Sequence, residues 1–456
     1  MTDPRLDALR SAVAEPSSPY GPVKIDRIKL SNYKFFHGDF ELAFNGKNVL
    51  IYGENGSGKS SIYRALEFLA KTRFNSIAKD RNIFAESTEP QIEFGFSNGK
   101  ALIIDSDLVE MPESFGFLRG LSVFVPLLDY KKLLKVHFSP TGNGETINVY
   151  AMFREIYKDY PYEKGRKASE ITDFNEYFNV LKTIANGDLL DEINTLIGFF
   201  DKDFKISKFT FKVETTPDGR PEPSVSIDID YRENPIERYH QFLNEARLSA
   251  LAISIYFASI RKLLGSLKME SLKILALDDL LISLDMSNRL KLLEILKSEF
   301  SDFQIFFFTH DKELFELYKN KMEWEAYELY LDDSGPIPKP IVKKGSSSIE
   351  KAKEYYARKE YEPCALMLRR EFEKLLKNIL PLKEQYDKNY NELDLAGLIG
   401  KSIAQSSGET EQILKNLDSH RKHILNPLSH ADNRNIFSGE LKATMEDLEK
   451  LKTLLK

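Results

Sequence analysis

A glycine-rich stretch, YGENGSGKSS at residues 52–61, contains residues whose types and spacing suit phosphate binding. It follows the pattern G-x-x-x-x-G-K-[ST], in which backbone N–H groups surround phosphates, a lysine reaches the β- and γ-phosphates and a hydroxyl ligates Mg²⁺. A chance glycine turn is the alternative, but a predicted strand precedes the stretch and a predicted helix follows it, as a P-loop requires. We therefore expect ATP to contact Gly53, Asn55, Gly56, Ser57, Gly58, Lys59, Ser60 and Ser61, with Lys59 catalytic and Ser60 a Mg²⁺ ligand.

Two other apolar stretches end in residues that can act on a bound triphosphate. ILALDD, residues 274–279, is predicted to be a buried strand that ends with Asp278 and Asp279. Asp278 is placed to hold Mg²⁺, and Asp279 to position or deprotonate the attacking water. FFFTHD places His310 at the end of another predicted strand, where its imidazole can sense the γ-phosphate. The structural alternatives are that the two aspartates only cap their strand and that His310 is only a hydrogen-bonded histidine at the end of its strand.

Apolar patterns predict the elements that hold these residues. Alternating and continuous apolar runs predict strands, and apolar residues at helical spacing predict helices. The result is an α/β head with mixed sheets and a short helical and hairpin insertion, followed by a small all-α domain. The expected boundaries are a mobile N-terminal segment at 1–22, the head at 23–331 with its insertion at about 150–240, a Pro- and Ser-Gly-rich linker at 332–348, and the helical domain at 349–456.

The order of these motifs resembles that of the ABC-type ATPases of the SMC and RecF group, over roughly residues 24–330. In that group a Leu-Ser-Gly-Gly-Gln signature opens a helix aimed at the nucleotide of the opposite subunit, and here LNEAR stands in its place. SLD, residues 283–285, matches the loop at the dimer contact. For the helix that LNEAR begins, an ordinary amphipathic helix is the alternative. The resemblance implies in-trans contacts from Asn244, Glu245, Ala246 and Arg247, and a dimer loop with Ser283 and Asp285.

The resemblance also implies a homodimer or higher oligomer of heads that close around two ATP molecules and open after hydrolysis. Asp279 stands where the group has a glutamate, so slow turnover is expected. The lid-loop glutamine is not evident, because residues 123–138 offer Asp129 instead. The insertion is too short to form the long arms of SMC proteins.

The variants LNEARLSALA, at 243–252, and LALDDLLISLD, at 275–285, resemble those of stand-alone ATPases of antiphage systems, including Septu-type and retron-associated components. They imply a nucleotide-gated sensor and scaffold that controls an effector nuclease. One alternative is an ATP-regulated RNase like the anticodon nucleases, and another is a RecF-like DNA repair ATPase, for which Lys131, Lys132 and Lys135 offer basic charge.

The C-terminal helices resemble HEPN-type domains, many of which cleave RNA. The predicted helix 362–380 carries an apolar face, and a later helix ends in an Arg- and His-containing segment. The RNase candidates implied by this resemblance are Arg369, Glu373, Arg421 and His430. The alternatives are a surface ion pair between Arg369 and Glu373, which are four positions apart, and a packing or docking module. Arg421 and His430 are nine positions apart, so the compact Arg-x-(4–6)-His spacing usual in HEPN domains is missing.

Composition limits the remaining classes of function. The chain has 456 residues, a formal net charge of −6 and a single cysteine, Cys364. One cysteine excludes an internal disulfide and fits a reducing cytoplasm. No apolar run is long enough to predict a membrane span, so no membrane partner is expected. Contact with RNA or DNA would require a local basic patch.

Overall fold

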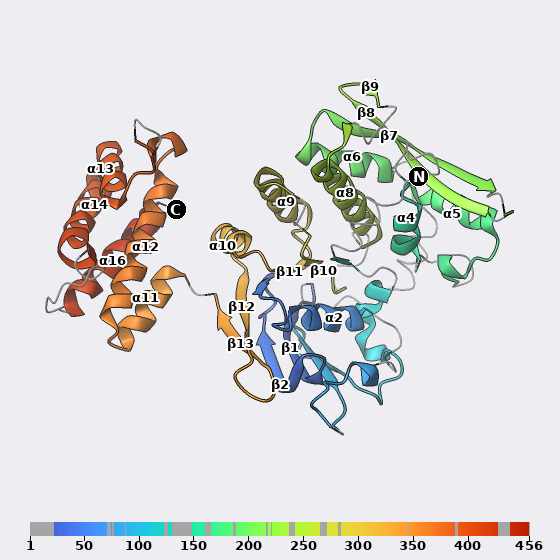
Figure 1. The fold of residues 1–456 in the computed structure, drawn as a ribbon, viewed down its shortest axis with the longest axis horizontal. Helices are drawn as coiled ribbons and strands as arrows, with labels where there is room; N and C mark the ends of the chain where they lie inside the picture. Colours follow the sequence, from blue (N-terminus) through green and yellow to red (C-terminus); the bar gives the residue numbers. More distant parts are fainter. Residues whose placement is uncertain are drawn as a thin grey trace. The chain divides into compact units, whose positions relative to one another are not determined.

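The chain forms two compact units, Met1–Lys344 and Gly345–Lys456. They are called here the head unit and the helical unit, and each is drawn in Figure 1. None of the described helices is long and apolar enough to cross a bilayer. The structure, a computed structural model, describes residues 22–70, 74, 77–86, 88–122, 126–129, 148–158, 160, 166–185, 188–215, 218–219, 221–236, 242–264, 271–280, 284–345, 347–387, 391–426 and 438–455.

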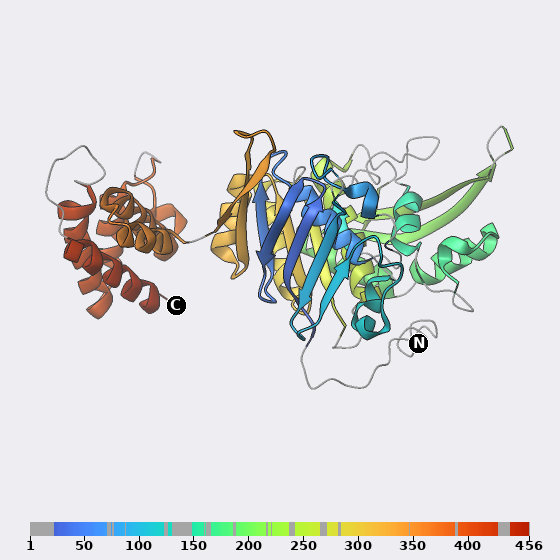
Figure 2. The ribbon, with the colours of Figure 1, turned by 90° about the horizontal axis from the view of Figure 1, so that it is seen from below.

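The first sheet of the head unit is antiparallel, with strand order β2-β1-β4-β5. Its strands alternate buried and exposed side chains, so that one face packs into a core shared with the central sheet (Figure 2). Asn98-Gly99 turns the chain between the last two strands. The bounds are β1 Ile25–Tyr33, β2 Phe36–Ala43, β4 Gln91–Phe96 and β5 Ala101–Ile104.

The central sheet has strand order β13-β12-β3-β11-β10-β6. All neighbouring pairs are parallel except β12 and β13. Because parallel strands end at the same edge of a sheet, the P-loop, the paired aspartates and the strand-end histidine are brought together there. The bounds are β3 Val49–Gly53, β6 Leu127–Asp129, β10 Ile274–Asp278, β11 Gln304–Thr309, β12 Glu325–Asp332 and β13 Lys339–Lys344.

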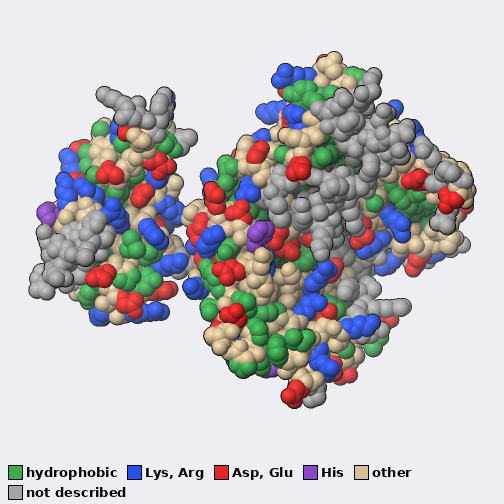
Figure 3. Space-filling model, viewed as in Figure 1, with side chains coloured by type: hydrophobic (Ala, Val, Ile, Leu, Met, Phe, Trp, Pro, Cys, Tyr) green, Lys and Arg blue, Asp and Glu red, His purple; other side chains and the backbone are tan. Residues whose placement is uncertain are grey.

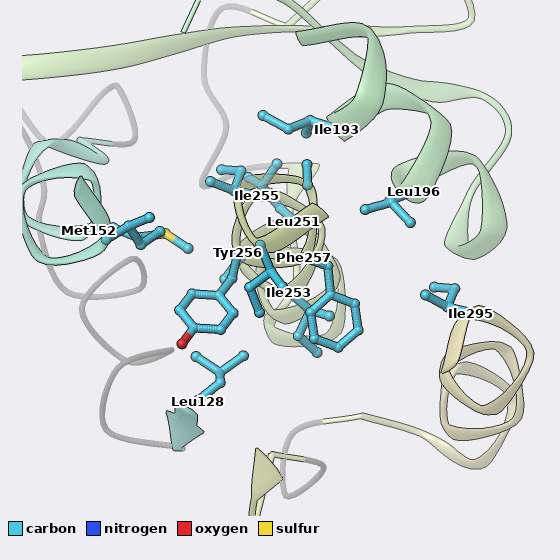
Figure 4. Packing of buried hydrophobic residues seen from close by; sticks show 14 of the residues in the cluster. Leu128, Met152, Ile193, Leu196, Leu251, Ile253, Ile255, Tyr256, Phe257 and Ile295 are labelled. Atoms are coloured by element: carbon cyan, nitrogen blue, oxygen red, sulfur yellow. The ribbon is translucent and has the colours of Figure 1, made fainter. Parts of the chain in front are cut away.

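Helices α2, Lys59–Leu69, and α8, Glu245–Leu264, connect the layers of the head. α2 contacts both sheets, since the ring of Tyr63 packs on Phe308 of β11 and the ring of Phe68 on Tyr33 of β1. α8 is buried almost all round, and Figure 4 shows its side chains among residues of α4, α6, α9 and β6. The other helices of the head are α4 Tyr150–Tyr157, α5 Phe174–Ala185, α6 Asp188–Phe200, α9 Met286–Glu299 and α10 Lys312–Lys321, with 3₁₀ turns at Ile77–Asp80, Glu113–Ser122 and Ala168–Glu170.

A long hairpin completes the insertion of the head unit. It joins β7, Phe204–Thr215, to β8, Pro221–Tyr231, and β8 also pairs with the short β9, Asn234–Pro235. Ile206 and Ile229 lie opposite each other in register, and both are buried. The hairpin thereby fastens to the same core as α6 and α8.

The helical unit packs its helices around one apolar core. On α12 the predicted apolar face is present, with Leu368, Phe372, Leu375 and Leu376 buried. A capping box between Ser347 and Glu350 starts the first helix. The bounds are α11 Ser348–Ala357, α12 Tyr361–Ile379, a 3₁₀ turn Leu382–Glu384, α13 Leu395–Gln405, α14 Gly408–His420, a π-helical turn Arg421–Leu425 and α16 Ser438–Leu454.

The predicted linker at 332–348 differs from the structure. Much of it is the turn and the second strand of the β12–β13 hairpin, and the head unit ends at Lys344. The prolines that suggested a linker are compatible with this position because β13 is an edge strand, where a missing N–H breaks no ladder. Only residues 345–347 separate β13 from α11.

Candidate nucleotide site

The P-loop has the backbone that a phosphate-binding loop requires. Gly56 and Gly58 have φ values of +83° and +94°, in the left-handed region. A Cβ at Gly58 would stand 2.6 Å from Cδ1 of Phe35, and a Cβ at Gly53 would stand 2.6 Å from Oγ of Ser57. α2 begins directly after Gly58 without a side-chain cap. The start of this helix is therefore available to an anion.

Two buried polar atoms at the site have no hydrogen-bond partner in the described part of the chain. They are Oγ of Ser57 in the loop and Oδ1 of Asp278 at the end of β10. A buried oxygen without a partner is costly, and a bound ligand is one common reason for it. Both atoms thus point to a ligand at this edge of the sheet.

A chain of contacts joins the three residues predicted to be catalytic. Nζ of Lys59 lies 3.2 Å from Oδ2 of Asp279, and this lysine side chain is only 8% exposed. Oδ1 of Asp279 lies 2.8 Å from Nδ1 of His310 and also accepts a hydrogen bond from the His310 backbone N–H at 2.9 Å. The structure therefore brings these three residues together, with Asp279 in the middle.

The backbone of Asp279 is unusual. Its φ of +51° lies in the left-handed region, which disfavours most side chains but which aspartate and asparagine tolerate. Its N–H donates to the carbonyl oxygen of Phe308 on the neighbouring strand. This conformation turns the carboxylate towards the P-loop, and no sequence pattern indicated it.

Asp278 and Asp129 mark the side of the site away from the histidine. Burial, and then the charge of Asp279, raise the pKa of Asp278 to about 6. In the parallel register of β10 and β6, Asp278 is paired with Asp129. The residue found in place of a lid-loop glutamine therefore lies beside the predicted metal ligand, although residues 130–138 lie outside the described residues.

The residues present fit a bound Mg²⁺. Mg²⁺ prefers oxygen ligands from carboxylates and hydroxyls, together with phosphate oxygens. Asp278 offers an orphaned carboxylate oxygen, and Ser60, exposed at the start of α2, offers a hydroxyl. Bound there, the ion would neutralise charge on the phosphates.

The proposed signature begins α8. Asn244 caps the helix, since its Oδ1 accepts a hydrogen bond from the N–H of Arg247 at 2.9 Å. Asn244 and Glu245 are exposed. The Arg247 guanidinium turns towards the insertion instead, where it pairs with Asp201 at 3.2 Å and lies over the ring of Phe242. The structure thus gives Arg247 partners within its own chain, and its predicted contact with a second subunit stays a prediction.

The predicted dimer loop is described in part. Asp285 caps α9 by accepting a hydrogen bond from the N–H of Asn288 at 2.9 Å, and Ser283 lies outside the described residues. Sequence reasoning missed Arg289, whose guanidinium donates to the carbonyl oxygen of Leu284 at 2.9 Å and pairs with Asp311 at 2.6 Å. This arginine fastens the loop after β10 to the loop after β11. The sequence signal that could have identified Arg289 is its position, one turn into a helix that an aspartate caps.

The RNase candidates of the helical unit have structural partners. Arg369 donates a hydrogen bond to Asn426 at 2.7 Å, and Arg421 pairs with Asp418 at 2.9 Å. Glu373 pairs with Lys377 at 3.0 Å, so the suggested ion pair between Glu373 and Arg369 is not the one that forms. His430 lies outside the described residues.

Comparison with known proteins agrees with a nucleotide site in the head. Residues 25–81 match the family described as the P-loop containing region of AAA domain. No curated protein sequence matches this chain.

Solved structures of similar fold are SMC head domains. One, an SMC head bound to the C-winged helix domain of ScpA, is 12% identical, covers 70% of this chain and 98% of that chain, and has a TM-score of 0.41. The SMC head domain from Thermotoga maritima is 12% identical, with coverages of 71% and 99% and a TM-score of 0.38. A third, with an extended coiled coil and bound to the C-terminal domain of ScpA derived from Pyrococcus furiosus, is 13% identical, with coverages of 74% and 100% and a TM-score of 0.39. The likeness is one of fold.

Proposed function

We propose that the head unit binds ATP with Mg²⁺ and hydrolyses it slowly, and that ATP binding switches its conformation. The observation that carries this proposal is the contact of Lys59 with Asp279. Lys59 is the P-loop cation, and its charge is balanced by the carboxylate expected to activate water. ATP phosphates compete for Lys59 and thereby release Asp279.

Hydrolysis then depends on Asp279 and His310. A released Asp279 carboxylate can accept a proton from a water molecule that attacks the γ-phosphate. His310 holds one oxygen of this carboxylate through its backbone N–H and its ring, which orients the other oxygen. An aspartate is one methylene shorter than a glutamate, and its left-handed backbone limits its reach. Both features favour slow turnover.

An ATPase assay on the pure chain tests this proposal. We expect phosphate release by the wild type and none by Lys59→Ala or Asp279→Ala. Binding of a fluorescent ATP analogue should be lost in Lys59→Ala alone. Hydrolysis that persists in Lys59→Ala would refute the assignment of the site.

We further propose that two heads close around two ATP molecules, each contacted by the start of α8 of the other head. Support comes from Asn244 and Glu245, which are exposed where α8 begins. Light scattering should show dimers with ATP in Asp279→Asn, where hydrolysis is blocked, and loss of these dimers in the double variant Asp279→Asn, Glu245→Arg. Dimers that form without nucleotide would contradict this arrangement.

In the setting implied by the sequence resemblance, this switch serves as a sensor and scaffold in antiphage defence and controls an effector nuclease. The helical unit has its own apolar core and follows β13 in the chain, which supports a docking role. Two measurements discriminate the alternatives. RNA cleavage by the pure chain, lost in His430→Ala, would favour the RNase. Salt-dependent DNA binding by ATP-closed heads would favour the repair ATPase, although Lys and Arg are interspersed with Asp and Glu on the face of the head drawn in Figure 3.

A further inference from the structure

A cavity lies in the insertion, and no P-loop residue lines it. It measures about 370 Å³ and lies between α4, α5 and the 3₁₀ turn Ala168–Glu170. α4 and α5 stand beside each other in Figure 1. A volume of this size falls in the range of small-molecule sites, roughly 300–1,000 Å³. Its lining residues include Tyr150, Arg154, Lys158, Ser169, Phe174 and Tyr177.

Aromatic rings form much of the cavity wall. Tyr150 of α4 and Tyr177 of α5 meet edge to face with their centroids 6.5 Å apart. Phe174, also in the lining, packs on Phe178 with the centroids 4.8 Å apart. Flat rings held in place by neighbouring rings offer a stacking surface to a planar ligand at low entropic cost.

The charges of the cavity leave one cation without a carboxylate. Lys158 is neutralised by Glu155, with which it pairs at 3.0 Å. Arg154 has no such pair within the part of the chain that the structure describes. Burial raises the pKa of both the Tyr150 and Tyr177 hydroxyls, and the positive charge of Arg154 partly offsets the rise at each. Arg154 therefore lies within electrostatic reach of both phenols.

We propose that this cavity binds a small ligand with a planar ring and a phosphate, of the nucleoside monophosphate class. Arg154 pairs with the phosphate, because a guanidinium matches its oxygens in two parallel hydrogen bonds. The hydroxyls of Tyr150, Tyr177 and Ser169 donate further hydrogen bonds, and the base stacks on the aromatic wall. This site goes beyond the proposed ATPase and does not depend on the P-loop.

Such a site is placed to influence the head. Tyr150 opens α4, and the buried Tyr157 at the other end of α4 donates a hydrogen bond to Ser259 of α8 at 2.8 Å. α8 is also the helix that begins with the exposed Asn244. A ligand that orders α4 and α5 therefore acts on a helix that reaches the proposed dimer contact.

Calorimetric titration of the full-length Lys59→Ala variant tests the proposal, since that change removes nucleotide binding at the P-loop. The probes are AMP, CMP and inorganic phosphate. We expect AMP and CMP to bind more tightly than phosphate, and Arg154→Met to weaken their binding roughly tenfold or more. Lys182→Met is the matched control, because Lys182 is an exposed cation of α5 that does not line the cavity. Its affinities should equal those of the parent.

The results that overturn the proposal are distinct from failure of the ATPase. No heat with AMP or CMP at millimolar concentration, in a variant that retains the folded circular-dichroism spectrum, rejects the site. Equal affinities for AMP and phosphate reject the stacking role of the aromatic wall. An equal loss in Arg154→Met and Lys182→Met rejects Arg154 as the anchor and indicates a non-specific charge effect.

Discussion

Replacing Asp279 with asparagine should have opposite effects on ATP binding and on ATP hydrolysis. Asparagine keeps the shape of the side chain and tolerates the left-handed backbone of this position, where alanine would add strain of about 1–2 kcal/mol. The change removes only the carboxylate that balances Lys59 and holds His310. Any effect on ATP therefore reports the charge of Asp279.

The size of the binding effect follows from the Lys59–Asp279 pair. At 3.2 Å, a pair of unit charges near a protein surface attracts with about 5 kcal/mol. Desolvation and residual exposure, 8% for the lysine and 23% for the aspartate, offset most of this, and a net pairing of about 1–2 kcal/mol remains. ATP must displace that pairing, so Asp279→Asn should bind ATP about 5- to 30-fold more tightly. Hydrolysis should fall by ~10²–10⁴-fold, the usual contribution of a general base.

Equilibrium titration with a fluorescent ATP analogue and a phosphate-release assay measure the two effects. Asp302→Asn is the matched control, since Asp302 pairs with the 9%-exposed Lys273 at 2.7 Å, at the opposite end of β10. Its ATP affinity and hydrolysis should not change. Weaker or unchanged ATP binding in Asp279→Asn would show that the pair does not compete with ATP. Hydrolysis reduced by less than about threefold would remove Asp279 from the role of base.

Three further predictions concern other residues. Gly58→Ala should destabilise the head by about 1–3 kcal/mol in urea unfolding and abolish ATP binding, because the added Cβ would clash with Phe35. Gly99→Ala is the control: φ is positive there as well, at +78°, but no atom lies within 4 Å of the added Cβ, so ATP binding should be retained. Burial raises the pKa of Asp278 to about 6, so Mg²⁺-dependent ATP binding should weaken as the pH falls through about 6, and a pH-independent affinity would contradict this. The contribution of Asp278 to folding stability has the opposite sign, because it is present below pH 3.8 and is lost as the pH rises through about 6. Burial also raises the pKa of the Cys364 thiol to about 11, so a disulfide reagent should modify it at least ~100-fold more slowly in the folded protein than in urea, and rapid labelling of the folded chain would show that this core opens.

That the candidate residues meet at one edge of the sheet was predictable, because it depends on local motifs and on one topological rule. The spacing of the P-loop motif predicts the backbone conformation of that loop. Strands that run parallel must end at the same edge of a sheet. Gly53, Asp278 and Thr309 therefore meet there once the strands have been recognised. Asp129 joins them for the same reason.

Side-chain partners were not predictable, because they depend on contacts between distant segments. Nothing in the sequence near Arg247 indicates that it turns towards Asp201, and nothing near Lys59 indicates that it pairs with Asp279. Asp285, assigned to a dimer loop, also serves as an ordinary helix cap. Strand β13 was missed because most of its side chains are exposed and no apolar alternation marks it.

The β12–β13 hairpin determines where the head unit can be cut from the helical unit. β12 is paired along β3, the strand that ends in the P-loop, and β13 is the last strand before Gly345. A truncated head should therefore end after Lys344. A cut at residue 331 would remove the edge strand β13 and leave β12 as an unpaired edge that can pair with another molecule and aggregate.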